Sequence, residues 1–214
     1  MAKNFATIAF SPAVKEMQEK LGSRASYARM EQRTWLDGLT ENEAEFISQR
    51  DSFYMASIGE NGFPYIQHRG GPKGFLKVLD TKRLGFIDFK GNMQFITVGN
   101  LVTNNRVALI MVDYPARTRL KIYARAEIVE LADDPDLYHI LDLSEYKFKP
   151  ERMMVLHVEA YDWNCPQHIV PRYTTGEIEA ALAPQRKLIA KLEAEIQLLK
   201  NKGRYKDVTG NGLG

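Results

Sequence analysis

Residues 53–89 read FYMASIGENGFPYIQHRGGPKGFLKVLDTKRLGFIDF, so short runs rich in Phe, Ile, Tyr and Val alternate with turn signals. The clearest of these signals, GENG and DTKR, separate runs of strand length. The connections are too short for crossover helices, which predicts a mostly antiparallel sheet, and six or seven such strands indicate a closed barrel. The predicted strands span residues 53–58, 64–68, 75–79, 84–89, 107–112, 120–131 and 153–160.

Helices are predicted at several points outside the strands. Ser11–Pro12 is a start signal for one helix, and Thr40 with Glu43 forms a capping box ahead of a second. Two more helices are expected over residues 93–104 and after Asp134–Pro135. The predicted fold class is therefore mainly β with peripheral helices.

The C-terminal part carries a different pattern. After Pro171, apolar residues recur at alternating steps of four and three residues, which is the spacing of a heptad seam. This spacing predicts a long C-terminal amphipathic helix, which either docks on its own barrel or packs against a partner subunit. The seam consists of Ile178, Leu182, Gln185, Ile189, Leu192, Ile196 and Leu199.

Composition narrows the class of protein. The 214 residues include 29 basic and 27 acidic side chains, so the net charge of +2 gives no electrostatic case for nucleic-acid binding. Cys165 is the only cysteine, which excludes an intrachain disulfide and fits a reducing cytoplasm. No apolar run is long enough for a membrane helix or signal peptide, so we expect a soluble protein.

The first of three polar signatures is QHRGGPKGFLKVLD, residues 67–80. Arg69, Lys73 and Lys77 lie among glycines beside Phe75, so cations and approachable backbone N–H groups adjoin an apolar strand face. This combination suits a phosphate attached to a flat aromatic ring. The alternative is a glycine-rich hairpin with a solvated charged edge.

The second signature is GNMQFITVGNL, residues 91–101. Asn92, Gln94, Thr97 and Asn100 have helical spacing, and the N-terminal N–H groups of the helix they begin would face an anion. Gly91–Asn92 is equally consistent with an ordinary turn followed by a helix cap.

The third signature, RTRLKIYARA, places Arg117, Arg119, Lys121 and Arg125 at alternate positions. On a strand, these four side chains share one face, and the apolar residues between them face the core. Such a row is ordinarily solvated. Arg119 and Lys121, at its centre, are the candidates for an anion or a dimer contact.

Other chemistry receives less support. Cys165 and His168 lack a third group that would orient a nucleophile pair. His68, His157 and His168 do not have the spacing of a metal site, and we predict no metal. The dinucleotide-binding, Walker and nucleophile-elbow motifs do not occur in the sequence.

Four motifs together resemble the FMN-binding split-barrel proteins related to pyridoxamine 5'-phosphate oxidase. They are QHRGGPKGFL, GNMQFITVGNL, MVDYPARTRLKI and WNCPQH, within about residues 42–172. The resemblance implies a six-stranded antiparallel split β-barrel that forms a homodimer, with FMN in a cleft between the subunits. The expected domains are a helical extension at 1–50, the FMN-binding barrel at 51–172, the amphipathic helix at 173–201 and a flexible tail at 202–214.

The resemblance also implies roles for residues. Residues 72–77 match the strand along the isoalloxazine, Arg69 or Lys73 supplies charge to the phosphate, and residues 91–97 match the phosphate and ribityl segment. Arg119 and Lys121 fall where the partner subunit reaches the flavin, and the tail segment offers Trp163 and Gln167 to the ring edge. The predicted cofactor-binding set is Arg69, Lys73, Phe75, Leu76, Lys77, Gly91, Asn92, Gln94, Thr97, Asn100, Arg119, Lys121, Trp163 and Gln167.

The function implied is an FMN-dependent oxidoreductase in which electrons pass through flavin N5 to an unknown small substrate. The sequence after Tyr173 lacks the arginine- and histidine-rich segment with which the true oxidase holds pyridoxal phosphate, so its substrate is not expected here. The alternatives are a flavin-binding module without catalysis, whose C-terminal helix recruits a partner, and a haem-binding barrel with His68 or His168 as axial ligand.

Overall fold

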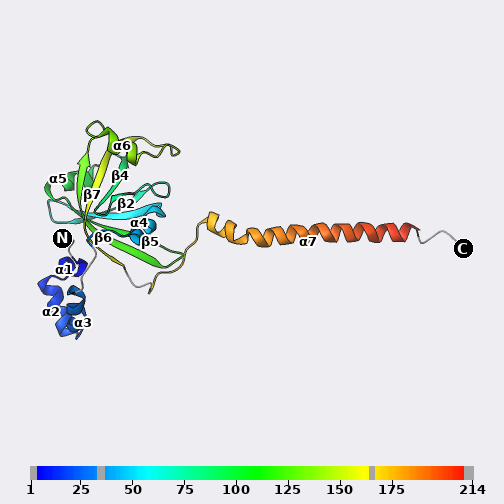
Figure 1. Cartoon of the computed structure of the whole chain (residues 1–214), viewed down its shortest axis with the longest axis horizontal. Helices are drawn as coiled ribbons and strands as arrows, with labels where there is room; N and C mark the ends of the chain where they lie inside the picture. Colours follow the sequence, from blue (N-terminus) through cyan, green and yellow to red (C-terminus); the bar gives the residue numbers. More distant parts are fainter. Residues whose placement is uncertain (1–3, 33–36, 164–166, 210–214) are drawn as a thin grey trace. The chain divides into compact units, whose positions relative to one another are not determined.

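The structure is a computed structural model that describes residues 4–32, 37–163 and 167–209. The chain forms two units, residues 1–170 and 171–214. The first unit holds seven strands and six helices among its described residues, and the second holds one long helix (Figure 1). The strands are β1 (Ser52–Ile58), β2 (Pro64–Gly70), β3 (Lys77–Asp80), β4 (Arg83–Phe89), β5 (Arg106–Asp113), β6 (Thr118–Val129) and β7 (Pro150–Trp163). The helices are α1 (Phe5–Ala9), α2 (Pro12–Lys20), α3 (Arg24–Glu31), α4 (Glu41–Ser48), α5 (Ile96–Thr103), α6 (Pro135–Leu141) and α7 (Thr175–Thr209).

All seven strands belong to one sheet in the order β2-β1-β5-β6-β7-β4-β3, and every neighbouring pair is antiparallel. This confirms the predicted antiparallel sheet; a strand lies at each predicted run, although the run at 75–79 becomes a strand only from Lys77. The predicted six-stranded closed barrel is not confirmed, because β2 and β3 end the sheet and no ladder joins them among the described residues. The seventh strand is the short β3, which pairs with β4 through a register shift between Val78 and Asp80.

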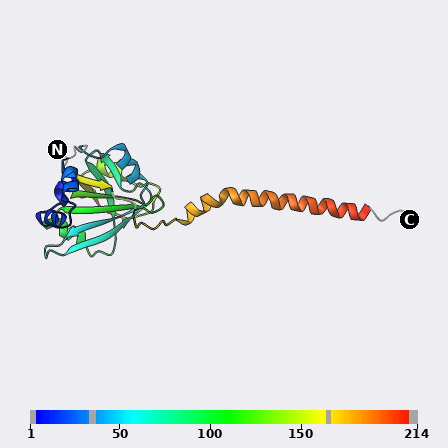
Figure 2. The same ribbon diagram turned by 90° about the horizontal axis from the view of Figure 1, so that it is seen from below.

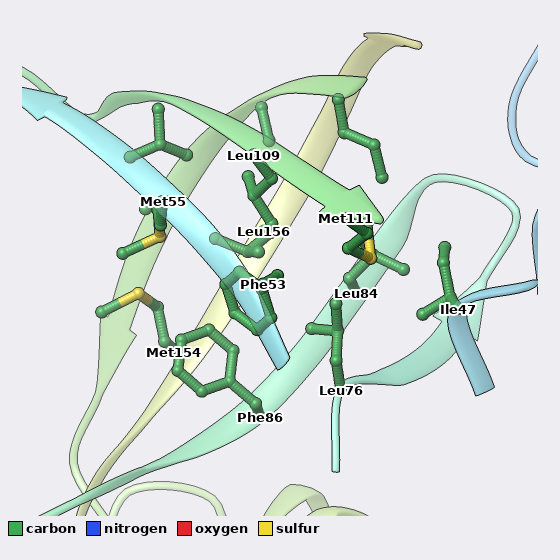
Figure 3. Packing of buried hydrophobic residues seen from close by; sticks show 14 of the residues in the cluster. Ile47, Phe53, Met55, Leu76, Leu84, Phe86, Leu109, Met111, Met154 and Leu156 are labelled. Atoms are coloured by element: carbon green, nitrogen blue, oxygen red, sulfur yellow. The ribbon is translucent and has the colours of Figure 1, made fainter. Parts of the chain in front are cut away.

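The strands curl around a main apolar core, seen in Figure 3, and a second, smaller cluster contains Ile87, Leu141 and Met153. Side chains at alternate positions point inward, as in the buried set Leu120, Ile122, Ala124 and Ala126 of β6. Strands distant in the sequence therefore share one interior, which the figure shows with Phe53, Met55, Leu84, Phe86, Leu109, Met111, Met154 and Leu156.

Phe75 and Leu76 belong to this core, with exposed fractions of 2% and 1%. The Phe75 ring stacks on Phe53 at a centroid distance of 5.5 Å. Gly71 permits this position, because a Cβ atom there would lie 2.7 Å from Cγ of Phe75. Gly71 of the first polar signature thus accommodates an aromatic core residue.

Of the N-terminal helices, α1 packs against β7, and both α1 and α2 pack against α3. Phe5 of α1 stacks on Tyr123 of β6 at 4.6 Å, and Ala6 is 1% exposed. The predicted caps are confirmed: Ser11 Oγ accepts a hydrogen bond from Val14 N–H, and Thr40 N–H donates to Glu43 Oε2 at 2.9 Å. The first part of the chain is therefore helical and joined to the sheet through α1.

Helix α5 begins at Ile96, three residues later than the predicted start at residue 93. Met93 and Phe95 have positive φ angles of 63° and 53°, and this left-handed backbone does not continue a right-handed helix. The predicted helix after Asp134 is confirmed, since the Asp134 side chain caps α6 by accepting from Leu137 N–H at 2.9 Å.

Helix α7 is one long helix, the orange and red rod of Figure 2, and it extends beyond residue 201. Thr174 and Glu177 form its capping box: Thr174 N–H donates to Glu177 Oε2 at 2.7 Å, and Glu177 N–H donates to Thr174 Oγ1 at 3.2 Å. Within the described part of the chain, no helix is both long and apolar enough to cross a membrane.

Candidate functional site

A small pocket lies between β2, β4, the start of β7 and the loop that leads into α5. Its volume is about 80 Å³, whereas pockets that bury a small molecule measure about 300–1,000 Å³. We call it the Arg69 pocket. Its lining residues are Tyr65, Gln67, Arg69, Asp88, Phe89, Gly91, Asn92, Met93, Gln94, Phe95, Ile96, Thr97, Val98, Glu151 and Arg152.

Two arginines and one aspartate form the charged floor of this pocket. Arg69 Nη1 pairs with Asp88 Oδ1, and Arg152 Nη1 lies 3.2 Å from Asp88 Oδ2. The exposed fractions of the three side chains are 11%, 12% and 6% for Arg69, Arg152 and Asp88. Because Asp88 and Arg152 are paired in the β4–β7 ladder, the ion pair to Arg69 connects β2 to these strands across the open side of the sheet.

The floor is close to electrically neutral but retains hydrogen-bond donors. Glu151 Oε2 lies 3.3 Å from Arg152 Nη1, so two carboxylates face two guanidinium groups. The contacts to Asp88 use Nη1 of each arginine, and each guanidinium carries five N–H donors. Arg69 Nε is buried without a hydrogen-bond partner among the described residues. An incoming anion would therefore find donors in place and a carboxylate as its competitor.

The loop over residues 91–95 forms one wall of the pocket. Its side chains are exposed, and Gln94 N–H donates to the Asn92 Oδ1 atom at 3.2 Å. Met93 and Phe95 hold left-handed backbone angles that cost energy for large side chains. Arg152 lies over the Phe95 ring, with Cζ 5.4 Å from its centroid. This conformation directs the chain into α5, whose first residues, Ile96, Thr97 and Val98, line the pocket.

Polar contacts fix α5 against the sheet. Thr97 Oγ1 donates to Gln67 Oε1 at 2.8 Å, and Asn100 Nδ2 donates to Ser57 Oγ at 2.9 Å. Thr97 and Ser57 are almost fully buried, with exposed fractions of 3% and 1%. Both contacts hold α5 against the sheet, and they give Thr97 and Asn100 partners within the protein.

Comparison with known proteins gives the family. Residues 39–162 match the family model described as pyridoxamine 5'-phosphate oxidase. The chain belongs to this family. The match begins before α4, includes all of β1–β6 and most of β7, and so contains the whole Arg69 pocket. The resemblance inferred from the four sequence motifs is thereby confirmed. A search of curated proteins found no match.

Solved structures with a similar chain fold include three bacterial proteins. HupZ of Group A Streptococcus is 15% identical over 63% of this chain and 100% of its own, with a TM-score of 0.47. A Clostridium acetobutylicum protein related to general stress protein 26 is 17% identical over 64% of this chain and 94% of its own, with a TM-score of 0.43. HutZ, the heme storage protein of Vibrio cholerae, is 16% identical over 56% of this chain and 89% of its own, with a TM-score of 0.37.

Five residues of the predicted cofactor-binding set meet at the Arg69 pocket of this family member: Arg69, Gly91, Asn92, Gln94 and Thr97. The side chains of Asn92 and Gln94 precede α5 instead of lying on it, because the helix begins at Ile96. Asn100 lines a neighbouring hollow beside Gly59 and Tyr65.

Other members of the set lie away from the pocket. Phe75 and Leu76 are core residues, Lys73 is exposed between β2 and β3, and Lys77 begins β3. None of these four is among the residues that line the Arg69 pocket.

The row of cations on β6 is only partly as predicted. Arg119, Lys121 and Arg125 lie on the face of β6 opposite the core, but Arg117 has a φ angle of 54° and lies in the turn before the strand. Lys121 Nζ lies 3.2 Å from Asp162 Oδ2 and 4.8 Å from the centroid of the Phe5 ring. Arg119 Nε is buried without a hydrogen-bond partner among the described residues.

Trp163, the last residue of β7, contacts two residues of α4. Its Nε1–H donates to Glu43 Oε1 at 2.6 Å, and its ring meets Phe46 edge-on at 4.8 Å. Burial raises the pKa of Glu43, but hydrogen bonds from Thr40, Trp163 and Asn42 outweigh it, and the pKa lies below its ordinary value. Burial, aided by the Glu43 charge, raises the pKa of Tyr161 to about 12.

Among the described residues, the remaining candidates do not line the Arg69 pocket. Gln167 is exposed, and Cys165 lies outside the described residues. His68 is exposed beside the Tyr54 ring, and His157 Nε2 lies 2.7 Å from Glu127 Oε2. In residues 4–32, 37–163 and 167–209, no cluster of three or more His, Cys, Asp or Glu side chains is arranged to hold a metal ion.

Sequence reasoning missed Asp88 and Arg152. Asp88 is the one charged residue of the apolar run LGFIDF, and a buried carboxylate needs a cationic partner. That signal was available in the sequence. The identity of the partners was not, because Arg69 and Arg152 lie 19 and 64 residues from Asp88 along the chain.

Proposed function

We propose that this protein is a cytoplasmic, homodimeric FMN-binding oxidoreductase whose cofactor phosphate binds at the Arg69 pocket. The observation that supports this proposal is that Arg69, Arg152 and the first residues of α5 line one pocket. The family to which the chain belongs supports a flavin as the ligand. Two guanidinium groups and helix N–H groups are the donors expected at a phosphate site. Asp88 holds both arginines in place in the absence of ligand.

Each group of the pocket has a distinct proposed role. Arg152 and Arg69 donate to phosphate oxygens, and the N–H groups of Ile96 and Thr97 add the positive end of the helix dipole. Asn92 and Gln94 offer exposed amides to the ribityl hydroxyls. The flavin supplies the redox chemistry itself, so the protein contributes binding, orientation and nearby charge.

The small volume of the pocket supports a role for a second subunit. At about 80 Å³ it accommodates a phosphate and its immediate neighbours but not a flavin ring. We propose that the ring extends beyond the pocket and is covered by a partner subunit. Arg119 is the candidate that the partner contributes, because its buried Nε has no hydrogen-bond partner among the described residues.

FMN titration of matched arginine variants tests the phosphate assignment. We expect the wild type to quench the fluorescence of one FMN per chain, and Arg152→Gln to weaken binding by about tenfold or more, since a charge-assisted contact contributes about 1.5–3 kcal/mol. Arg83→Gln is the control: Arg83 lies on β4, the strand that pairs with β7, but its contact is Asp80 and its side chain is 51% exposed. Equal FMN affinity in Arg152→Gln and wild type contradicts the assignment.

Reduction of the bound flavin tests the enzymatic part separately. We expect NADH or NADPH to bleach the oxidised FMN spectrum anaerobically, and an added acceptor to restore it. Tight FMN binding with no reduction by either nucleotide would instead support the non-catalytic flavin module.

A further inference from the structure

Helix α7 exposes a continuous apolar seam. In the heptad nomenclature abcdefg, Leu182, Ile189 and Ile196 take position a, and Ile178, Gln185, Leu192 and Leu199 take position d. The exposed fractions of the six apolar seam residues range from 37% for Leu182 to 67% for Leu199. Pro184 takes position c, away from the seam. A seam of this length needs an apolar partner to remove it from water.

The charged side chains at position e, beside this seam, have no residue of opposite charge three or four positions away on their own helix. Position e is occupied by Glu179, Arg186, Glu193 and Lys200, so the sign of the charge alternates along the helix. An ion pair within a helix joins residues three or four apart, and the one such pair on α7 in the described residues is Lys191 with Glu195. The four e residues lie seven apart and are therefore available to another helix.

We propose that the α7 helices of two copies of this chain pair as an antiparallel coiled coil. With Ile189 opposite Leu192 of the second copy, Leu182 lies opposite the second copy's Leu199. In an antiparallel pair, e residues face e residues. In this register, Arg186 faces the second copy's Glu193, and Glu179 faces its Lys200, so two-fold symmetry produces four pairs of opposite charge.

A parallel pair satisfies fewer of these charges. In that arrangement, each e residue faces the g residue of the preceding heptad on the other helix. Arg186 would then face Ala181, Glu193 would face Leu188, and Lys200 alone would face an opposite charge, Glu195. The charge pattern thus selects the antiparallel arrangement and a second copy as the occupant of the seam.

Charge reversal of the full-length protein tests the register. Arg186→Glu and Glu193→Arg each replace two attractive contacts by two repulsive ones, and each is expected to weaken α7 pairing by about tenfold. The double variant Arg186→Glu/Glu193→Arg is expected to restore pairing. Pairing is measured by the yield of an α7 disulfide, described next, because the barrels also associate under the proposed function. A double variant no better than the single variants overturns the proposal.

Disulfide trapping distinguishes the two orientations. In a Cys165→Ser background, Leu182→Cys and Leu199→Cys chains are mixed and oxidised, and mass spectrometry identifies the linked residues. We expect the mixed disulfide between residues 182 and 199 and little linkage of either variant with itself. Self-linkage of Leu182→Cys would show a parallel pair, and no linkage at all would show that the seam docks on its own barrel or on a different protein. Either result overturns the proposal.

A pair of leucines provides the matched control for the seam. Leu192, at position d, and Leu198, at position c, are exposed by 47% and 61%. In the chains used for trapping, Leu192→Asp is expected to abolish the disulfide between residues 182 and 199, and Leu198→Asp to leave it unchanged. Equal loss in both variants would overturn the assignment of the seam.

Discussion

Removing the charge of Asp88 should destabilise the free protein and leave a site that an anion can repair. In Asp88→Asn, Arg69 and Arg152 lose the carboxylate that both contact, while their side chains remain only 11% and 12% exposed. Breaking a buried ion pair by removing one partner costs about 3–5 kcal/mol. Because Glu151 remains 3.3 Å from Arg152, we expect a loss near the lower limit, about 3 kcal/mol.

The assay is urea denaturation of wild type and Asp88→Asn, each with and without saturating FMN. Since the phosphate of FMN can replace the lost carboxylate, FMN should raise the free energy of unfolding of Asp88→Asn more than that of wild type. The control is Asp80→Asn, which removes an exposed partner of Arg83 and should cost at most about 0.5 kcal/mol. The reasoning is refuted if Asp88→Asn unfolds at the wild-type urea concentration, or if FMN stabilises both proteins equally.

Two further predictions concern the scaffold. The pKa of Glu43 is lowered in the folded protein, so its stabilisation is complete above the ordinary value of 4.5 and is lost as the pH falls through the folded value. Glu43→Gln should therefore lower the free energy of unfolding at pH 7 by about 2 kcal/mol, because the hydrogen bonds from Thr40 and Trp163 are weakened. The difference between variant and wild type should shrink as the pH falls below the folded pKa of Glu43. A difference in the free energy of unfolding that does not depend on pH would contradict this. Gly71→Ala should lower the free energy of unfolding by about 1–3 kcal/mol, because the new Cβ would press on the Phe75 ring. Gly99→Ala, on helix α5, should raise it by about 0.5–1 kcal/mol, because no other described part of the protein lies within 4 Å of the new Cβ. Thermal melts in which both variants behave alike would refute this distinction.

The strands were predictable because their signal is local. Alternation of apolar residues gives the core face, and turn signals such as GENG mark the ends, so the predicted run at 84–89 coincides with β4 but for its first residue. The same reasoning placed 75–79 in one strand. In the structure, β3 begins at Lys77, because Gly71 makes room for Phe75 to enter the core before the strand starts.

The start of α5 could not be predicted from the same signals. Asn92 and Gln94 have helical spacing, but the left-handed angles of Met93 and Phe95 delay the helix. Glycine or asparagine ordinarily marks such a conformation, and neither stands at those two positions. The delay places the first residues of α5, Ile96 to Val98, at the pocket that Arg69 also lines.

The candidate site was half predictable. Arg69 and residues 91–97 were indicated by their composition and by the resemblance to the family. Asp88 and Arg152 depend on the pairing of β4 with β7, which brings residues 64 positions apart into contact. Long-range pairing of this kind is fixed by the whole sheet, so no local pattern in the sequence reveals it.

An absorbance spectrum of the protein purified without added cofactor, with mass analysis of any chromophore released on denaturation, tests the central claim most directly. A flavin spectrum with FMN as the released compound, bound in a ratio of one per chain, is the predicted result. A colourless protein that also fails to take up added FMN would contradict the assignment of the Arg69 pocket as a flavin phosphate site.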